Sequence, residues 1–197
     1  MAVEVNHEAR RKLVVARSID LFAKMGYSKV SFLTISEATG IARTALYRYF
    51  KTKREIFDEA IHGITSEIKD SLGRISRKRL PVARRLEEAC DIVIDTLYGR
   101  RDFFSAIYEF VFSMVRVGED MTQRIEQFTG GFKVALSRLV AEGVASGELR
   151  RNVDPADAAE ALYALMESVA LRLLLGVEKD SRRAKERFCA VIAALSA

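Results

Sequence analysis

The chain has 197 residues, of which 49% are apolar, and its formal net charge is +5 at pH 7. That length and apolar content suffice for a hydrophobic core, which excludes a disordered chain and a small scaffold held together by disulfides. No segment approaches the roughly 18 apolar residues of a membrane span and no apolar leader precedes the first helix, so we expect a cytoplasmic protein with no membrane partner and two reduced cysteines, Cys90 and Cys189.

Hydrophobic periodicity at the helical spacing runs through nearly the whole chain, and both prolines stand at plausible helix starts. We therefore expect an all-α fold of about nine helices. Positive charge is concentrated near the N-terminus: residues 1–55 hold 11 Lys/Arg against 5 Asp/Glu, a net of +6, whereas residues 56–197 hold 21 against 22, a net of −1. A basic head on a neutral body indicates a binding surface for a polyanion at one end.

The first predicted helix runs from about His7 to Met25. Its apolar stripe would support the two short helices that follow, and it consists of Val14, Ser18, Leu21, Phe22 and Met25. The basic run at residues 10–12 fits either phosphate contacts or a solvated helix end, and the sequence favours neither.

Residues 31–53 predict a helix-turn-helix. A first short helix covers about Leu33 to Thr39, and Gly40 stands where the chain must turn sharply, a place that favours a residue able to adopt positive φ. In the second helix Leu46 and Phe50 lie four residues apart and share one face, which we expect to be buried. The other side then carries groups that bond phosphate oxygens and base edges in a major groove, namely Arg43, Thr44, Tyr47 and Arg48.

Two stretches around this motif resemble the signature of the TetR family of transcriptional regulators. They are LFAKMGY at residues 21–27 and LYRYFKTKRE at residues 46–55, and the resemblance covers about residues 10–57. A looser resemblance covers GELR at 147–150 and DPADAA at 154–159. The resemblance implies a homodimer that binds a double-stranded DNA operator and responds to a small effector.

The resemblance also assigns DNA contacts residue by residue. Positions that contact the DNA backbone in the family are matched by Tyr47, Tyr49 and Lys53. Base discrimination is expected of Arg43, Thr44 and Ala45, and Arg48 completes the DNA-binding set.

The recognition helix departs from the family pattern at its start. The family usually has Ser where this chain has Ala42, and alanine cannot cap the free N–H groups there, although Thr44 could partly compensate. Thr44 and Ala45 stand where Gly and Thr are common, so we expect this chain to prefer different bases.

A connecting helix is expected from Lys53 to about Arg77. Five further helices are expected at about 82–99, 102–116, 119–146, 155–176 and 180–195. This pattern predicts a DNA-binding domain of three helices at residues 1–52 and an effector-binding and dimerisation domain at residues 53–197.

The helix at 102–116 is apolar nearly all round, so we expect it to be surrounded by other elements. Aromatic residues gather on it and on both neighbouring helices, namely Tyr98, Phe104, Tyr108, Phe112, Phe128 and Phe132. Such a cluster can fill a core or line a cavity. The family resemblance favours the cavity, and the aromatic lining predicts a small, largely apolar effector.

The helix at 155–176 has apolar groups on two faces, and the helix at 180–195 adds a third apolar stripe. One face can pack within the subunit and another would then need a partner, as in the four-helix dimer interface of the resembled family. The interface is predicted at Ala161, Ala164, Leu171, Phe188 and Ile192. A monomer that uses all these faces internally is the alternative.

An enzyme is the rival class, and the sequence offers little for it. His7 and His62 are the only histidines, neither has metal-ligand spacing, and no phosphate-binding loop or nucleophile motif is present. We therefore expect no catalytic residue, metal site or cofactor. The family resemblance implies a ligand-responsive repressor on a palindromic operator, and the sequence leaves open a constitutive DNA binder or an interaction module that has lost DNA binding.

Overall fold

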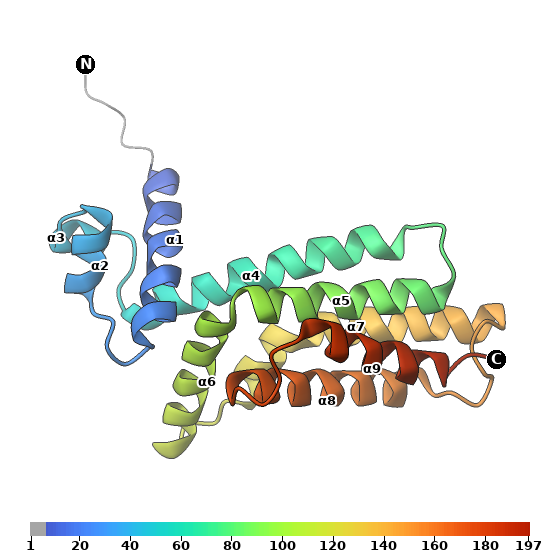
Figure 1. Cartoon of the computed structure of the whole chain (residues 1–197). Helices are drawn as coiled ribbons and strands as arrows, with labels where there is room; N and C mark the ends of the chain where they lie inside the picture. Colours follow the sequence, from blue (N-terminus) through green and yellow to red (C-terminus); the bar gives the residue numbers. More distant parts are fainter. Residues whose placement is uncertain (1–6) are drawn as a thin grey trace. The chain divides into compact units, whose positions relative to one another are not determined.

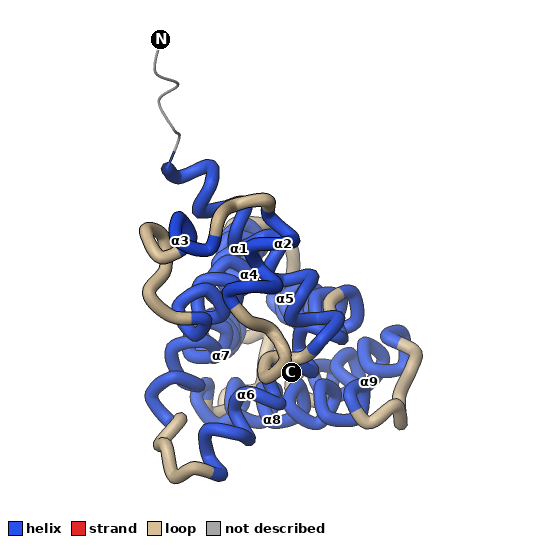
Figure 2. The backbone as a smooth tube through the Cα atoms, turned by 90° about the vertical axis from the view of Figure 1, so that its left-hand side faces the viewer, coloured by secondary structure: helices blue, strands red, loops and turns tan. Residues whose placement is uncertain are grey.

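The computed structural model describes residues 7–197, and this part of the chain folds into helices joined by short loops (Figures 1 and 2). Nine α-helices lie within it: α1 His7–Met25, α2 Phe32–Thr39, α3 Arg43–Leu46, α4 Lys53–Ser76, α5 Val82–Gly99, α6 Arg101–Arg116, α7 Thr122–Ser146, α8 Pro155–Leu174 and α9 Ser181–Ala193. The predicted all-α fold is confirmed, and the predicted bounds of α1 and α5 coincide with those observed.

The described chain divides into two compact units. The first comprises the described residues up to Ile64 together with Asp102–Met121, and the second comprises Thr65–Arg101 and Thr122–Ala197. Packing therefore places α6 with the N-terminal helices, and it divides α4 between residues 64 and 65. The sequence indicated neither feature, because helical periodicity shows that a face is buried and leaves its partner undetermined.

An aromatic cluster forms the core of the first unit. Phe57 of α4 meets Phe22 of α1 edge-on at 4.7 Å between ring centroids and Phe110 of α6 at 5.3 Å. The ring of Tyr27 lies 4.6 Å from that of Phe110. Edge-to-face pairs at these separations stabilise a core beyond the area they bury. These contacts hold α6 against the helices that carry the DNA-binding motif.

The expectation that α6 is surrounded on all sides is wrong. Its buried stripe is Phe103, Ala106 and Phe110, which share one face at helical spacing. On its other side Phe112 is 57% exposed and Val115 is 55% exposed. One stripe suffices to anchor α6, and its other apolar residues are half-buried or exposed.

The second unit is a helical bundle in which α5 packs against α7, α8 and α9. Its core includes Leu86, Cys90 and Ile94 of α5, all fully buried. Cys90 and Cys189 are both free thiols, as expected, and burial raises the pKa of Cys90 well above its ordinary value. A buried thiol of raised pKa is a packing residue with little reactivity.

The predicted interface residues on α9 require a correction. Phe188 and Ile192 are buried within this single chain, with 1% and 0% of their surface exposed, so both belong to the core of their own unit. The sequence identified a genuine apolar stripe but assigned it to the wrong partner. The exposed residues in the last turns of α9 are instead Ala190, Val191 and Ala193.

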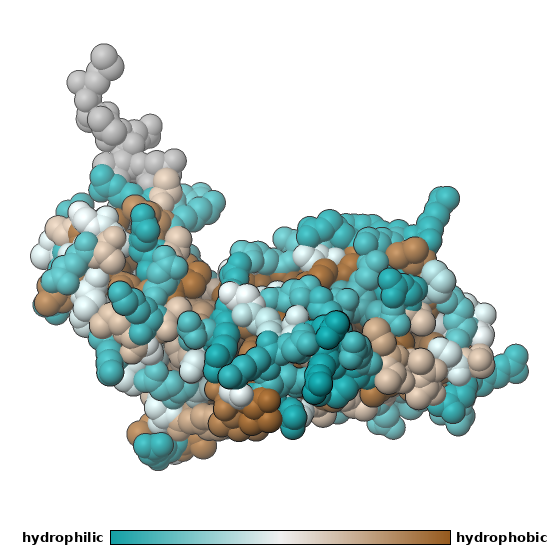
Figure 3. All heavy atoms as spheres, in the orientation of Figure 1, coloured by the Kyte–Doolittle hydropathy of each residue, from teal (hydrophilic) through white to brown (hydrophobic). Residues whose placement is uncertain are grey.

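By contrast, α8 keeps an exposed small and apolar face. Ala161 and Ala164 are exposed, and Leu171 is 45% exposed. Further along, Leu175 and Val177 are also exposed, and Figure 3 shows apolar surface gathered below the centre of the view, where α8 leads into α9. This face is available for contact with another chain.

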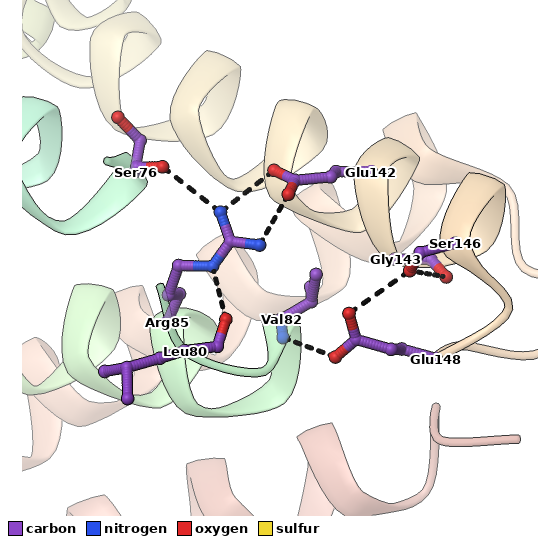
Figure 4. A network of polar contacts seen from close by, with 8 residues as sticks. All are labelled: Ser76, Leu80, Val82, Arg85, Glu142, Gly143, Ser146 and Glu148. Atoms are coloured by element: carbon purple, nitrogen blue, oxygen red, sulfur yellow. Dashed lines mark hydrogen bonds and ion pairs between the residues drawn. The ribbon is translucent and has the colours of Figure 1, made fainter. Parts of the chain in front are cut away.

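A buried arginine joins three segments of the second unit (Figure 4). The Arg85 guanidinium forms a two-pronged ion pair with Glu142 of α7, with Nη2 2.6 Å and Nη1 3.0 Å from the carboxylate oxygens. It also donates to the carbonyl oxygens of Ser76, at the end of α4, and Leu80, each at 3.1 Å. The pKa of Glu142 is lowered, chiefly by its hydrogen bond to Arg85.

Glu148 supplies the helix cap that Pro81 cannot. Its Oε2 accepts a hydrogen bond of 2.6 Å from the N–H of Val82, the first residue of α5, and its Oε1 lies 3.2 Å from the Ser146 hydroxyl (Figure 4). A carboxylate at this position satisfies a free N–H group and interacts favourably with the helix dipole.

We expect Arg85→Met to lower the free energy of unfolding by about 2–3 kcal/mol, because it leaves two carbonyl groups without their donor and Glu142 without its partner. Urea denaturation at one protein concentration would measure this change. Arg84→Met is the matched control: Arg84 is exposed and pairs with Glu87 one turn away, so its loss should cost less than about 0.5 kcal/mol. If the two substitutions lower the free energy of unfolding equally, the Arg85 network stabilises the fold no more than an exposed ion pair does.

Candidate DNA-binding surface

The helix-turn-helix is built by local capping. Ser31 accepts a hydrogen bond from the Thr34 N–H at 3.2 Å, and the Thr34 hydroxyl oxygen accepts one from the Ser31 N–H at 2.9 Å, so the two residues form a capping box that starts α2. Gly40 ends α2 at φ 68°, in the left-handed region, and donates to the Ser36 carbonyl at 2.9 Å. The predicted turn at Gly40 is confirmed.

Two hydroxyl side chains of α2 hold the turn in place. The Ser36 hydroxyl donates to the Ile41 carbonyl at 2.7 Å, and the Thr39 hydroxyl accepts from the Ile41 N–H at 3.3 Å. These bonds satisfy backbone groups that the turn would otherwise leave unpaired.

The recognition segment places its residues as its spacing predicted. Leu46 and Phe50 are buried, with 0% and 1% of their surface exposed. On the opposite side the exposed residues are Arg43, Thr44, Tyr47 and Arg48, whereas Ala45 and Tyr49 are half-buried. The regular part, α3, is a single turn and is followed by tight turns at 47–49. Ala42 provides no side-chain cap, as expected.

An aromatic stack fixes the ring of Tyr47. The ring of Phe32, the first residue of α2, lies parallel to it at 4.6 Å between centroids and 5° between planes. Because Phe32 belongs to α2, this stack sets the orientation of Tyr47 relative to the rest of the motif. The phenol remains at the surface, where 48% of the residue is exposed.

Arg11 braces the recognition segment from α1. Its Nη1 donates to the Tyr49 carbonyl at 2.7 Å, and its guanidinium lies over the Phe50 ring at 4.3 Å from the centroid. It also forms an ion pair with Glu59 of α4. Arg11 therefore has partners in the recognition segment and in α4, and a phosphate contact by this basic run stays a prediction.

Lys53, the first residue of α4, is bound to the loop that follows α1. Its ammonium donates to the Tyr27 carbonyl at 2.8 Å and to the Ser28 carbonyl at 3.3 Å, and it lies 4.2 Å above the centroid of the Tyr27 ring. Burial lowers the pKa of Lys53, and the charge of Glu109 opposes that shift. Its contact with a DNA phosphate stays a prediction, and the structure adds this internal role.

Glu109 of α6 binds the same loop through its N–H groups. Its carboxylate accepts hydrogen bonds from the N–H groups of Tyr27 at 3.0 Å and Ser28 at 3.1 Å, and from the Ser28 hydroxyl. Burial opposes ionisation of Glu109, but these hydrogen bonds and the charge of Lys53 hold its pKa below its ordinary value. No sequence pattern indicated these contacts, because Glu109 is separated from Tyr27 by 82 positions and from Ser28 by 81.

The six residues predicted to bind the effector are divided between the two units. In the first unit Phe104 and Tyr108 are half-buried on α6, and Phe112 is exposed. In the second, Phe132 is buried, Phe128 is half-buried, and the Tyr98 hydroxyl donates to the Asp180 carbonyl at 3.4 Å. Their joint role in a pocket stays a prediction.

Comparison with known proteins identifies both regions of the chain. Residues 14–60 match the family of bacterial regulatory proteins of the TetR type, and residues 82–197 match the C-terminal region of BetI-type transcriptional repressors. The chain belongs to the TetR family. This membership confirms the resemblance found in the sequence and makes the chain a transcriptional regulator with a DNA-binding helix-turn-helix.

Individual transcriptional regulators align over nearly the whole chain. The transcriptional regulator PksA of Bacillus subtilis is 25% identical over 184 residues, which cover 91% of this chain and 87% of PksA. A TetR regulator from Haloarcula marismortui has the same fold, with a TM-score of 0.84 at 16% identity and coverage of 96% and 100%. Bacillus subtilis FadR, solved in complex with stearoyl-CoA, gives a TM-score of 0.73 at 17% identity and coverage of 92% and 96%.

No helix in the described part of this TetR-family chain is long and apolar enough to cross a membrane.

Proposed function

We propose that the chain is a ligand-responsive repressor that binds a palindromic operator as a homodimer and is released from it by a small, largely apolar effector. One observation carries the DNA-binding part. The recognition segment, which consists of α3 and the turns that follow it, buries Leu46 and Phe50 and leaves the cationic and hydroxyl groups of Arg43, Thr44 and Arg48 exposed. That arrangement suits phosphate and base-edge contacts in a major groove.

The exposed face of α8 supports the dimer. Ala161, Ala164, Ser168, Leu171 and Leu175 follow one another at spacings of three or four residues, so they form one stripe, and all are exposed in the single chain. Small residues on such a stripe let two helices approach closely. A twofold axis through this face would relate the recognition segments of the two subunits. These segments must lie about 34–36 Å apart to enter successive major grooves.

Effector control would act on that separation. A ligand that binds better to one conformation of the dimer shifts the population toward it, and operator affinity falls if the favoured conformation has the wrong spacing. The aromatic residues of α5, α6 and α7 suggest an apolar ligand. Because FadR was solved with stearoyl-CoA, long-chain acyl-CoA thioesters are a rational first set of probes.

The proposal is tested by titrating the DNA upstream of the chain's own gene in a mobility-shift assay, followed by footprinting. We expect protection of two half-sites with twofold symmetry and a complex that contains an even number of chains. Absence of binding to this DNA and to a randomised operator library would instead favour an interaction module.

The effector is tested by thermal shift, because the chain contains no tryptophan for fluorescence. A ligand present at about a hundred times its dissociation constant should stabilise the protein by roughly 2.7 kcal/mol. The same compound should release the operator. If no compound in a broad apolar library, stearoyl-CoA included, shifts the melting temperature, a constitutive DNA binder is the better account.

A further inference from the structure

The loop between α1 and α2 is bound by two opposite charges. The Glu109 carboxylate accepts hydrogen bonds from the N–H groups of Tyr27 and Ser28. The Lys53 ammonium donates to the carbonyl oxygens of the same two residues. An anion at the N–H groups and a cation at the carbonyl groups each form charge-assisted hydrogen bonds, which are stronger than neutral ones.

Gly26 leaves the space that the carboxylate occupies. It ends α1 at φ 78° and donates to the Phe22 carbonyl at 2.9 Å. A Cβ atom at this position would overlap Oε2 of Glu109, so a larger residue would displace the carboxylate from the place it occupies. The loop is therefore shaped to receive Glu109.

This loop controls the placement of the DNA-binding motif. It connects α1 to Ser31, where α2 starts, and Lys53 follows the recognition segment directly in sequence. The orientation of α2 and α3 therefore depends on the conformation of Tyr27 and Ser28. Fixing that conformation before DNA arrives removes an entropic cost from binding.

The carboxylate that fixes the loop belongs to a helix that is connected to both units. α6 packs in the first unit, but the chain enters it from the second unit at Arg101 and returns there after Met121. The Arg54 guanidinium at the start of α4 adds a two-pronged ion pair to Glu119 just beyond α6, with Nη1 3.0 Å from the carboxylate. α6 is thus bonded to the segments that flank the motif and covalently joined to the unit that carries α5 and α7.

We propose that Glu109 is a positioning residue for operator binding: it holds the Tyr27–Ser28 loop in the DNA-competent conformation, and displacement of α6 releases the loop. The inference rests on the proposed function. It names the polar contact through which a movement of α6 would reach the recognition segment. Glu109 itself touches no base or phosphate.

The test is Glu109→Gln, with Asp102→Asn as the matched control. Glutamine keeps the shape of the side chain but turns an NH2 group toward one of the loop donors. It therefore cannot accept hydrogen bonds from the N–H groups of both Tyr27 and Ser28. Asp102 is an exposed carboxylate on the same helix, and its substitution removes the same charge. Operator binding would be followed by fluorescence anisotropy over a range of salt concentrations.

We expect Glu109→Gln to weaken operator binding about tenfold, with an unchanged salt slope, because every phosphate remains in contact with the protein. Asp102→Asn should leave affinity unchanged or raise it slightly. Amide hydrogen exchange at Tyr27 and Ser28 should accelerate in Glu109→Gln alone. Ser28→Ala, which removes one of the three bonds and no charge, should weaken binding about twofold and serves if Glu109→Gln folds poorly.

Equal affinities of Glu109→Gln, Ser28→Ala and the wild type would overturn the inference, and so would a loss of affinity accompanied by a shallower salt slope. Failure of the wild-type chain to bind any operator would refute the proposed function instead, so the two failures are distinguishable.

Discussion

A chain that carries Ala164→Glu and Leu171→Glu is expected to sediment as a folded monomer of about 22 kDa, the mass of one chain. Both positions are exposed on the same stripe of α8, so the substitutions leave the subunit core intact. Across a twofold interface each glutamate would lose water, and the dimer would bring four carboxylates into one interface. Burying unpaired carboxylates costs several kcal/mol, which exceeds what an interface of small side chains can offset.

The monomer should bind the full operator at least about a hundredfold more weakly, because the second half-site is no longer held at high effective concentration. Analytical ultracentrifugation and anisotropy would measure the two effects on the same samples. Circular dichroism should show unchanged helix content, since the altered side chains lie outside the core.

Val134→Glu with Ala141→Glu provides the control for this experiment. These residues are exposed on α7, have the same seven-residue spacing and introduce the same two charges. The control should remain a dimer with full operator affinity. Phe188→Asp is unsuitable as an interface test, because it places a charge in the subunit core and should unfold the chain. A folded dimer of the α8 variant would place the interface elsewhere.

The second large effect is expected at Lys53. Lys53→Ala removes an ammonium that holds the Tyr27 and Ser28 carbonyl groups and that the family resemblance assigns to a DNA phosphate. Losing both roles should weaken binding to all operators alike, by roughly thirtyfold, since phosphate and loop contacts position the protein without reading sequence. The dependence of log affinity on log salt should become shallower by about one unit for each phosphate that the variant no longer neutralises.

The salt slope separates the two roles of Lys53. If its whole contribution is to hold the loop, affinity falls while the slope stays constant, as expected for Glu109→Gln. Arg43→Ala serves as the comparison variant, because Arg43 lies on the reading face, the exposed side of the recognition segment that is expected to contact bases. This variant should discriminate less between operator variants, with about 1–3 kcal/mol lost at the base that Arg43 contacts. A Lys53→Ala chain that binds some operators normally and others weakly would contradict the assignment of backbone contacts.

Local chemistry made the helix-turn-helix predictable from sequence. Gly40 is positioned to take positive φ, and four-residue spacing places Leu46 and Phe50 on one face and Arg43 and Thr44 elsewhere. These features depend on residues within one or two helical turns of each other. The same holds for the ends of α1 and α5, which fall where the hydrophobic periodicity stops.

Hydrophobic periodicity could not predict contacts between segments that are distant in the sequence. A stripe shows that a helix face is buried, so Phe188 and Ile192 were found as apolar, but the same stripe would serve a subunit core or a dimer interface equally well. Likewise the composition of α6 indicated burial on all sides, whereas its packing uses Phe103 and Phe110 and leaves Phe112 in solvent.

The sequence by itself therefore determined the helices, the reading face of the recognition segment and the TetR family. Only the tertiary structure decided that α6 belongs with the DNA-binding motif and that Glu109 and Lys53 hold the Tyr27–Ser28 loop between them. The physical reason is that a carboxylate or ammonium carries no periodicity. Its partner is whichever backbone the fold brings within hydrogen-bonding distance, here 25 to 82 residues away along the chain.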